Sequence, residues 1–379
     1  MPGYDVIVVG ASGGAGSAAA HHLARRGARV LGLDRFPPGH DRGSSHGETR
    51  VIRLAYFEHP DYVPLLRRAY ALWRELGERR GKPLLHEIGV VEIGRPDGEI
   101  VRGVVDTALR HDLDVDVLVG SEVMRRFPGL RVPEGLVAVY EREAGYLDVE
   151  DCVIEHASAA REAGADLRVG EEMLSWETAG GGVRVRTDRA TFEAGRLVLA
   201  LGAWAGDALA DPNIHFETVA KTLYWYEAPL AVHAADGGCP VFLYELSDGV
   251  FYGVPRVSDR GMKVAEHTGG HPVADPLAGD RRLDQAEGAR VDRFVESCLP
   301  GAGPRVLGQA LCFYPMSPDG HFVVGLHPRH PEVSLVAGLS GHGFKFTSVL
   351  GEILADLALD GVTRAPIEFL SSSRPAVQS

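Results

Sequence analysis

The chain has 379 residues, of which 45% are hydrophobic and 24% charged, a composition ordinary for a globular protein and long enough for two domains. Its formal net charge of -13 disfavours a nucleic acid or an anionic membrane as partner, and no run of about 18 apolar residues is present that would span a membrane. A strand pattern starts at residue 5 and leaves no room for a signal peptide, so we expect a cytoplasmic protein. The four cysteines are scattered without zinc-ligand spacing, and we therefore expect reduced thiols and no metal site.

The first 34 residues predict a nucleotide-binding element. Residues 5–9 form an apolar strand, a glycine-rich loop occupies 10–16, residues 17–26 predict a helix, and 29–33 predict a second strand that ends at Asp34. A dinucleotide site needs this order, because glycines let the backbone approach a pyrophosphate, a helix N-terminus faces its charge, and an acid binds the ribose hydroxyls. The alternative is a tight turn between strand and helix that binds no ligand.

The glycine spacing in this loop is irregular. The usual pattern is Gly-x-Gly-x-x-Gly, whereas one extra residue here precedes the second glycine. We expect the second and third glycines to take their usual roles, and Ser12 either to bulge or to lend its hydroxyl to a phosphate. The residues expected to contact the nucleotide are Gly10, Ser12, Gly13, Gly14, Gly16, Asp34 and Arg35.

The rest of the chain shows two kinds of pattern. Helical periodicity is found at residues 62–79, 100–111, 149–163, 284–298 and 343–359, and strand patterns at 86–93, 182–186, 191–201, 219–227, 241–246, 250–255, 261–267, 306–314, 321–324 and 333–337. We predict an α/β plus α+β fold with two domains, in which a Rossmann-like nucleotide-binding domain carries an inserted antiparallel-sheet domain. The first is assigned residues 1–82, 145–215 and 320–379, and the second 83–144 and 216–319.

Four further segments carry unusual combinations of residues. They are 46–53 (HGETRVIR), 251–268 with its FYGVP and GMKVAEHT parts, 311–314 (LCFY) and 338–346 (GLSGHGFKF). With the N-terminal loop and Gly202-Ala203-Trp204, they resemble the monomeric sarcosine oxidase and N-methyltryptophan oxidase family of covalent flavoproteins, in order, to about residue 370. The resemblance implies that the nucleotide is FAD and that the protein is an amine oxidase using oxygen.

Cys312 matches the family cysteine that forms a thioether with the flavin 8α-methyl group. A thiolate suits that attack because it is a strong nucleophile; the alternative is a buried, inert cysteine, which we expect for Cys152, Cys239 and Cys298. The turn 341–345 opens the last helix, whose N-terminus would stabilise negative charge on a reduced flavin, unless His342 is merely packed there. The other cofactor-binding residues that the resemblance implies are Ser45, His46, Thr49, Arg50, Gly202, Trp204, Gly341, His342, Gly343, Phe344 and Lys345. A plain role in the core is the alternative for Trp204.

The resemblance also implies a substrate site. Arg53 and Lys345 match positions that hold the substrate carboxylate, by a planar grip and a point charge respectively. Lys263 matches a lysine that promotes oxygen reduction by stabilising superoxide; the alternative is an exposed strand lysine. Arg50 matches an arginine close to the flavin ring. The remaining pocket residues that orient the amine are Tyr252, His267 and Tyr314.

Two places depart from sarcosine oxidases. Glu92 stands in an apolar strand, where it would either face solvent or enter the pocket and pair with a cationic amine. The run Tyr224-Trp225-Tyr226 is more aromatic than expected. Both leave room for a secondary amine larger than sarcosine.

We expect an FAD-dependent oxidase of secondary N-methyl amino acids. A hydride would pass to flavin N5, the imine would hydrolyse to an amino acid and formaldehyde, and oxygen would be reduced to peroxide. One alternative is oxidation of a cyclic imino acid such as pipecolate or a biosynthetic intermediate; another is a flavin-binding protein without catalysis, which the irregular glycine loop favours and the set of Arg53, Lys263, Cys312 and Lys345 opposes. The expected partners are a small secondary amino acid and oxygen, and we expect a monomer.

Overall fold

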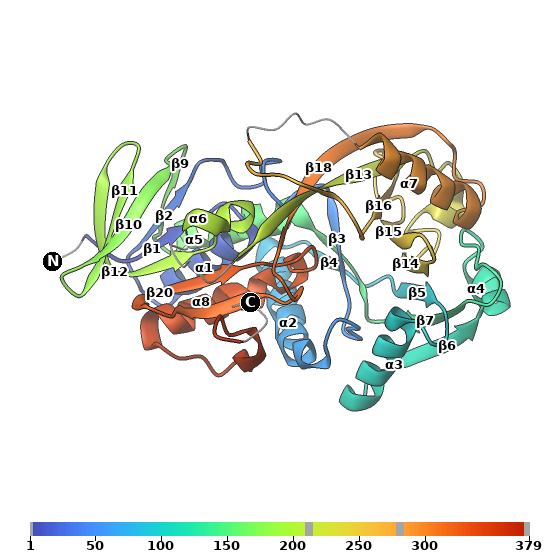
Figure 1. Cartoon of the computed structure of the whole chain (residues 1–379), viewed down its shortest axis with the longest axis horizontal. Helices are drawn as coiled ribbons and strands as arrows, with labels where there is room; N and C mark the ends of the chain where they lie inside the picture. Colours follow the sequence, from blue (N-terminus) through green and yellow to red (C-terminus); the bar gives the residue numbers. More distant parts are fainter. Residues whose placement is uncertain (1–2, 209–214, 278–283, 375–379) are drawn as a thin grey trace.

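The computed structural model describes residues 3–208, 215–277 and 284–374 and contains two large sheets that lie at opposite ends of an elongated molecule (Figure 1). The predicted domain ranges also include residues 1–2, 209–214, 278–283 and 375–379, which lie outside the described residues. The domain boundaries stay a prediction. Within the described ranges, no helix is long and apolar enough to cross a membrane.

The first sheet has eight strands and a parallel centre. The parallel strands are β20 (His330–Ala337), β12 (Thr191–Leu199), β1 (Tyr4–Val9), β2 (Val30–Asp34) and β9 (Asp166–Val169), paired in that order. The antiparallel strands are β10 (Met173–Ala179) and β11 (Gly182–Thr187) beside β12, and β19 (Val323–His327) beside β20. The central strands are almost continuously apolar because the sheet is covered on both faces.

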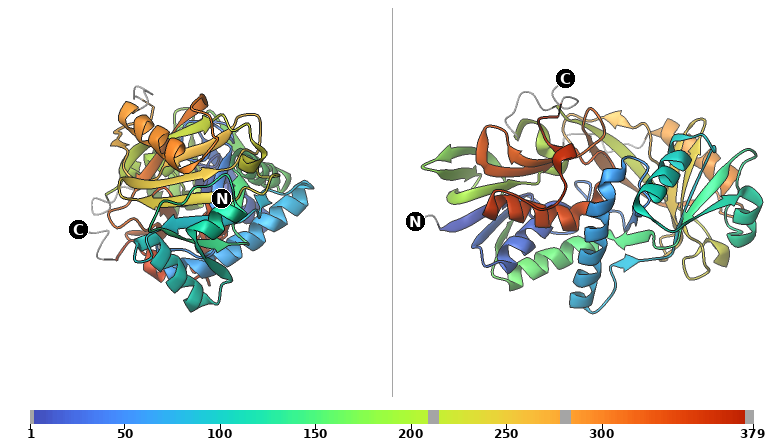
Figure 2. Two further views of the ribbon diagram at one scale, coloured as in Figure 1. Left: turned by 90° about the vertical axis from the view of Figure 1, so that its right-hand side faces the viewer. Right: turned by 90° about the horizontal axis from the view of Figure 1, so that it is seen from below.

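Helices cover one face of this sheet. Helix α1 (Gly14–Arg25) packs between α5 (Val149–Glu162) and α8 (Thr347–Asp360), and α2 (Val63–Arg80) packs against α8. The small residues of α1 permit the close approach, since a Cβ added at Gly351 of α8 would lie 2.4 Å from the Cβ of Ala18. The views in Figure 2 show these helices beneath the sheet.

The second sheet has nine strands and is mostly antiparallel. Its path is β17 (His271–Pro272), β13 (Glu217–Tyr226), β16 (Met262–Glu266), β15 (Gly249–Val254), β14 (Val241–Leu246), β5 (Val90–Gly94), β7 (Val137–Glu141) and β6 (Val115–Val119), and β18 (Val306–Met316) pairs with β13. Only the β14–β5 pair among those described is parallel. The helices that accompany it are α3 (Glu99–His111), α4 (Gly120–Arg126) and α7 (Gln285–Cys298).

A small third sheet lies between the two large ones (Figure 1). It joins β3 (Thr49–Ile52), β8 (Gly145–Asp148) and β4 (Leu85–His86). Short elements complete the described chain: α6 (Ala205–Ala208), η1 (Pro60–Tyr62), η2 (Gly202–Trp204), η3 (Ala231–His233), η4 (Phe344–Phe346) and η5 (Glu368–Leu370).

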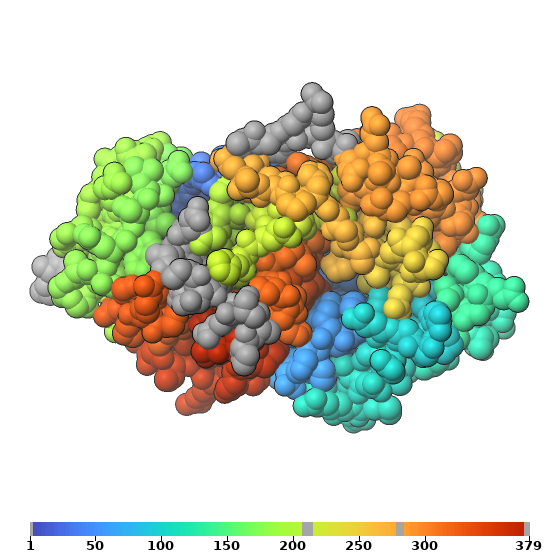
Figure 3. Space-filling model, viewed as in Figure 1, coloured from blue at the N-terminus to red at the C-terminus, as the bar shows by residue number. Residues whose placement is uncertain are grey.

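The two-domain α/β plus α+β fold is confirmed by these sheets and by related solved structures described below. The strand predicted at 86–93 is wrong as one element, because the chain turns at Gly89 (φ +83°) and pairs its halves with different sheets. The strands that were not predicted are β3, β6, β7, β8, β9, β10 and β17. In the space-filling view, the blue-to-cyan part of the chain lies below the yellow and orange part on the right-hand side of the molecule (Figure 3).

Candidate active site

One cavity of about 390 Å³ joins the two sheets. It starts at the carboxyl ends of β1, β2, β12 and β20, the usual place for ligands on parallel sheets, and reaches β14, β15 and β18 of the second sheet. The predicted site residues that line it are Gly10, Gly13, Gly14, Asp34, Arg35, Ser45, Arg50, Arg53, Gly202, Trp204, Tyr252, His267, Cys312, Tyr314, Gly341, His342, Gly343, Phe344 and Lys345. Those that do not line it are Ser12, Gly16, His46, Thr49, Glu92 and Lys263.

The glycine turn brings the backbone of β1 against the start of α1. Gly10 has φ +87°, and a Cβ there would lie 2.2 Å from the carbonyl oxygen of Ala200. A Cβ at Gly16 would lie 2.0 Å from the carbonyl oxygen of Gly10, so this glycine sets the helix–strand contact. The first turn of α1 contains no acidic residue, so the positive end of its dipole faces the cavity at Gly13 and Gly14 without a counter-charge on that turn.

Asp34 is oriented by the backbone at the end of β2. Its carboxylate accepts the N–H of Ser12 at 2.9 Å and that of Phe36 at 2.9 Å. Burial raises the pKa of this carboxyl despite the two hydrogen bonds. The structure therefore gives Ser12 a backbone contact to Asp34 and places it off the cavity wall, which does not match the expected hydroxyl–phosphate contact. Beside it, the Arg35 guanidinium lies 4.7 Å from the Trp204 ring.

The loop before β3 connects the glycine turn to Cys312. The Ser45 hydroxyl accepts the N–H of Gly14 at 3.2 Å, and the Ser44 hydroxyl donates to the carbonyl of Phe313 at 2.5 Å. Arg50 donates to the Ser44 carbonyl at 3.0 Å and to the sulfur of Cys312 at 3.2 Å. A half-buried cation thus faces the sulfur on the cavity wall.

His46 and Thr49 lie behind this wall. Burial and the charge of Arg50 lower the pKa of His46 to about 4, so its imidazole is neutral near pH 7. Its Nε2 and the hydroxyl of Thr49 are buried without a hydrogen-bond partner among the described residues. The side chains of His46 and Thr49 are therefore positioned by the loop and do not line the cavity.

Lys263 is buried on β16, contrary to the alternative of an exposed strand lysine. Its ammonium donates to the carbonyls of Gly47, at 3.1 Å, and Thr49, which lie just behind Arg50. Burial and the Arg50 charge hold the pKa of Lys263 well below its usual value, while Glu48 and Glu150 act in the opposite direction. The side chain of Lys263 does not line the cavity and lies behind residues that do.

At the other end of the cavity, Arg53 and Lys345 lie together. Arg53 donates to both oxygens of Glu58, at 3.0 and 2.9 Å, and its guanidinium lies 4.4 Å from the Tyr56 ring. The Lys345 ammonium donates to the carbonyl of His342 at 2.9 Å. Burial and the charge of Arg53 lower the pKa of Lys345 to about 7, whereas Arg53 holds the pKa of Glu58 at about 2 against the effect of burial.

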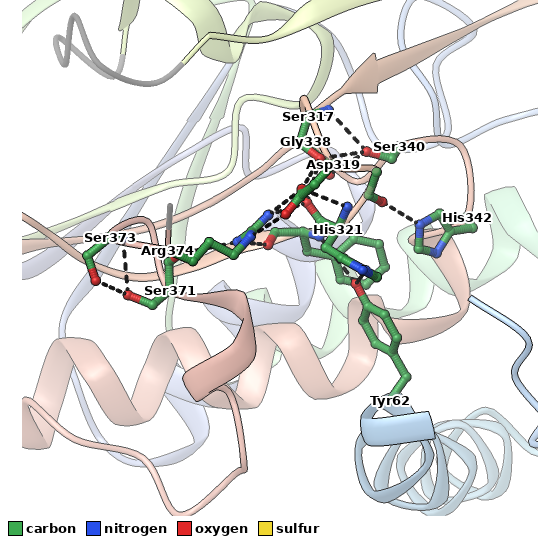
Figure 4. Close-up of polar contacts among 12 residues, drawn as sticks. Tyr62, Ser317, Asp319, His321, Gly338, Ser340, His342, Ser371, Ser373 and Arg374 are labelled. Atoms are coloured by element: carbon green, nitrogen blue, oxygen red, sulfur yellow. Dashed lines mark hydrogen bonds and ion pairs between the residues drawn. The ribbon is translucent and has the colours of Figure 1, made fainter. Parts of the chain in front are cut away.

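The turn that carries His342 is fixed from two sides. The His342 Nε2–H donates to the carbonyl of Gly320 at 2.9 Å, so Nδ1 accepts the Tyr56 hydroxyl at 2.5 Å. Figure 4 shows the neighbouring network, in which the Ser340 hydroxyl accepts the N–H of Ser317 and Arg374 binds Asp319. The C-terminal segment therefore holds the 317–321 loop, which in turn supports the 340–342 turn. A 3-10 turn, η4, separates this turn from α8, which begins at Thr347 rather than at 343.

Three predicted pocket residues form an aromatic group on the second sheet. The His267 ring lies 5.8 Å from that of Tyr314 and 6.3 Å from that of Tyr252. Burial lowers the pKa of His267 to about 4, so it is neutral near pH 7. The aromatic run 224–226, in contrast, does not line the cavity: Trp225 donates to Glu48, and Tyr226 donates to Asp292. It therefore gives no reason to expect a larger substrate.

Glu58 was not among the predicted site residues, and both positions predicted for Glu92 are wrong. Glu58 lines the cavity and pairs with Arg53 five residues before it in the chain; a lone acid in a loop next to a functional arginine was the available signal. Glu92 neither faces solvent nor enters the pocket, since it is 1% exposed and pairs with Arg53 from outside the cavity wall.

Comparisons with known proteins all point to one family of flavin-dependent oxidoreductases. Residues 5–357 match the family model described as FAD dependent oxidoreductase. The chain is 43% identical to a monomeric sarcosine oxidase from Streptomyces avermitilis, over 99% of this chain and 98% of the relative. It is 35% identical to an N-methyl-L-tryptophan oxidase from Yersinia pestis, over 98% and 99% of the two chains.

Solved structures agree with this assignment. NikD, an unusual amino acid oxidase essential for nikkomycin biosynthesis, aligns with a TM-score of 0.84 and 26% identity over 97% of each chain. Glycine oxidase from Geobacillus kaustophilus has a TM-score of 0.80 over 99% of each chain at 23% identity, which supports the fold alone. No metal-binding group of three or more His, Cys, Asp or Glu side chains occurs within the described ranges.

Proposed function

This chain belongs to the FAD dependent oxidoreductase family, with monomeric sarcosine oxidase and N-methyl-L-tryptophan oxidase among its relatives, and from that premise we propose that it oxidises secondary, N-methylated amino acids with oxygen. The observation that carries the proposal is one continuous cavity. It has a glycine turn and a helix N-terminus at one end and the two buried cations Arg53 and Lys345 at the other.

The residues present fit FAD. The backbone of Gly13 and Gly14 would hold the pyrophosphate, where an added Cβ at Gly14 would lie 2.9 Å from Thr347 and where α1 supplies positive potential. Asp34 would hold the ribose, and the ring would lie between Arg50, Cys312 and the 341–345 turn. When bound, the flavin would accept the hydride and would then pass the electrons to oxygen.

Arg53 and Lys345 would bind the substrate carboxylate. Their side chains lie on the same end of the cavity, and guanidinium and ammonium groups both favour carboxylates. The neutral imidazole of His267 would accept a hydrogen bond from the substrate amine, and Tyr252 and Tyr314 would enclose it. Placement of this kind supplies much of the barrier reduction in such reactions.

Lys263 would act on oxygen from behind the cavity wall. Its Nζ donates to two carbonyls just behind Arg50, and a proton on this nitrogen would stabilise negative charge that develops on oxygen beside Arg50. The products of the complete reaction would be an amino acid, formaldehyde and peroxide.

Cys312 is proposed as the covalent attachment point, because its sulfur lies on the wall within 3.2 Å of the Arg50 guanidinium. Cys312→Ala should release the flavin when the protein is precipitated with acid, whereas the unchanged protein should retain it. Cys298→Ala, at a buried cysteine remote from the cavity, is the matched control. Flavin that stays attached in Cys312→Ala would disprove this attachment point.

The reaction is tested with purified protein and a panel of sarcosine, N-methyltryptophan, proline and pipecolate, with peroxide and formaldehyde measured separately. The proposal predicts equal amounts of both products from the N-methyl substrates. Peroxide without formaldehyde would contradict demethylation and would indicate that a ring carbon of the substrate is oxidised. Neither product from any compound, with flavin bound, would favour a non-catalytic flavin-binding protein.

A further inference from the structure

Arg53 is held by two carboxylates that approach different nitrogens. Glu58, on the cavity wall, accepts from the terminal nitrogen NH2 at 3.0 and 2.9 Å. Glu92 lies on the other side, with Oε1 3.2 Å from Nε. A third contact, from NH1 to the carbonyl of Ala55 at 3.2 Å, completes the cage around the guanidinium. The two acids therefore share one cation before any substrate arrives.

The surroundings of Glu92 are otherwise apolar. Its neighbours across the sheet are Leu243 on β14 and Val139 on β7, and the side chain is 1% exposed. The charged or titratable groups that act on it are Arg53 and Glu58 from the loop after β3, Glu141 from β7, and Lys345 from η4. Glu141 is committed elsewhere, because its oxygens accept the N–H groups of Leu54 and Ala55.

A substrate carboxylate would bring a further negative charge into this group. Arg53 would then face three carboxylates, and water is excluded from Glu92, so the cost of an extra buried anion would be high. Resting on the proposed function, we infer that Glu92 positions Arg53 from behind and is a neutral acid in the substrate complex, so that Glu92 that is ionised in the free enzyme takes up a proton from solvent when the substrate carboxylate binds. The exchange balances: one carboxylate arrives, and one becomes a neutral acid.

Glu58 and Glu92 differ in the way this role requires. Arg53 lowers the pKa of Glu58 to about 2, so Glu58 stays ionised. Burial raises the pKa of Glu92 to about 8 although Arg53 acts against it, because the guanidinium charge is already shared with Glu58. Glu92 is thus the acid of the pair that is protonated near neutral pH, and its contact at Nε leaves the terminal nitrogens of Arg53 to Glu58 and to the carbonyl of Ala55.

The test compares holoenzyme with Glu92→Gln, using propionate as a carboxylate that carries no amine to oxidise and propionamide as its uncharged counterpart. Affinity is read from the change in the visible flavin spectrum on titration. Above its pKa of about 8, ionised Glu92 must be protonated before propionate binds. The dissociation constant of the unchanged protein divided by that of Glu92→Gln should therefore be near one at about pH 7 and rise about tenfold by about pH 9. Ionised Glu92 raises the pKa of Lys345, so the same ratio is also measured in a Lys345→Arg background, in which residue 345 stays charged.

Calorimetry in two buffers of different ionisation enthalpy measures the number of protons taken up on binding. Near pH 8 the unchanged protein should take up more protons on binding propionate than Glu92→Gln does. Glu87→Gln, an ion-paired residue at the surface, should behave like the unchanged protein. A ratio that stays constant with pH, or affinity lost equally at all pH values, would overturn the role of Glu92 and leave the carboxylate site intact. Failure of propionate to bind, or equal binding of propionamide, would instead overturn the carboxylate site of the proposed function.

Discussion

At the end of the cavity beside β1, close backbone contacts of one short segment, residues 10–16, shape the wall, whereas the opposite end is lined by the charged side chains of Arg53, Glu58 and Lys345, drawn from two distant segments. The glycine end contains a turn and a helix N-terminus whose positions are set by close backbone contacts. The cation end depends on charges that are buried together and shift each other's pKa values. The comparison teaches that shape determines binding at the first end and charge balance at the second.

The largest effect should follow from removing the central charge of the cation end. Arg53→Met would leave Glu58 and Glu92 buried without their cation, and breaking a buried pair on one side costs about 3–5 kcal/mol. Urea unfolding should show that loss of stability, and kcat/KM for sarcosine should fall steeply.

The double variant Arg53→Met/Glu58→Gln separates the two roles of Arg53. It should regain a large part of the stability because one uncompensated charge is removed, yet substrate binding should remain lost. Equal recovery of binding would show that the arginine serves the fold and not the substrate.

Substitution of Lys263 tests whether a charge that lies behind the cavity wall also affects the reaction. Lys263→Met should slow reoxidation of the reduced enzyme by oxygen by about a hundredfold, the usual scale for losing one electrostatic donor, while anaerobic reduction by substrate changes little. Stopped-flow measurement resolves both steps. Equal slowing of both would assign Lys263 to substrate placement instead.

The glycine end is tested by a single methyl group. Gly16→Ala places a Cβ 2.0 Å from the carbonyl oxygen of Gly10, so α1 must shift, at a cost of about 1–3 kcal/mol. The temperature of thermal unfolding and the flavin content of the protein should both decrease. Gly206→Ala is the matched control because nothing lies within 4 Å of its added Cβ; similar losses in both variants would remove the special role of the close contact.

The smallest effect is a pH dependence at the cation end. Burial and Arg53 lower the pKa of Lys345 to about 7, so its charge is present below that pH and is lost as the pH rises through it. The affinity for carboxylates should weaken by up to about tenfold per pH unit above 7. In Lys345→Arg, which stays charged, this decline should shrink. A flat affinity from about pH 6 to 8 in the unchanged protein would contradict the assignment.

The same comparison explains what the sequence could predict. The glycine turn, Asp34 and α1 follow one another in the chain, so their pattern predicts both the elements and the site. The family resemblance placed Arg53, Lys345 and Cys312, which the structure brings to one cavity.

The misses come from contacts between distant segments. Strand β3 and its partner β8 are each four residues long and acquire their strand character only by pairing across almost a hundred residues of chain. The position of Glu92 could not be read from strand alternation, because both faces of β5 are buried. Its partner Arg53 lies in another segment, so the ion pair has no local signal in the sequence.

The central claim is that one cavity holds both a flavin and the carboxylate of a secondary amino acid. It is tested most directly by adding sarcosine or another N-methyl amino acid to the purified protein in the absence of oxygen and recording the visible spectrum. The account predicts a yellow protein that is bleached by such a substrate and regains its colour when air is admitted. A yellow protein that keeps its colour with every secondary amino acid, or a folded protein that binds no flavin, would contradict it.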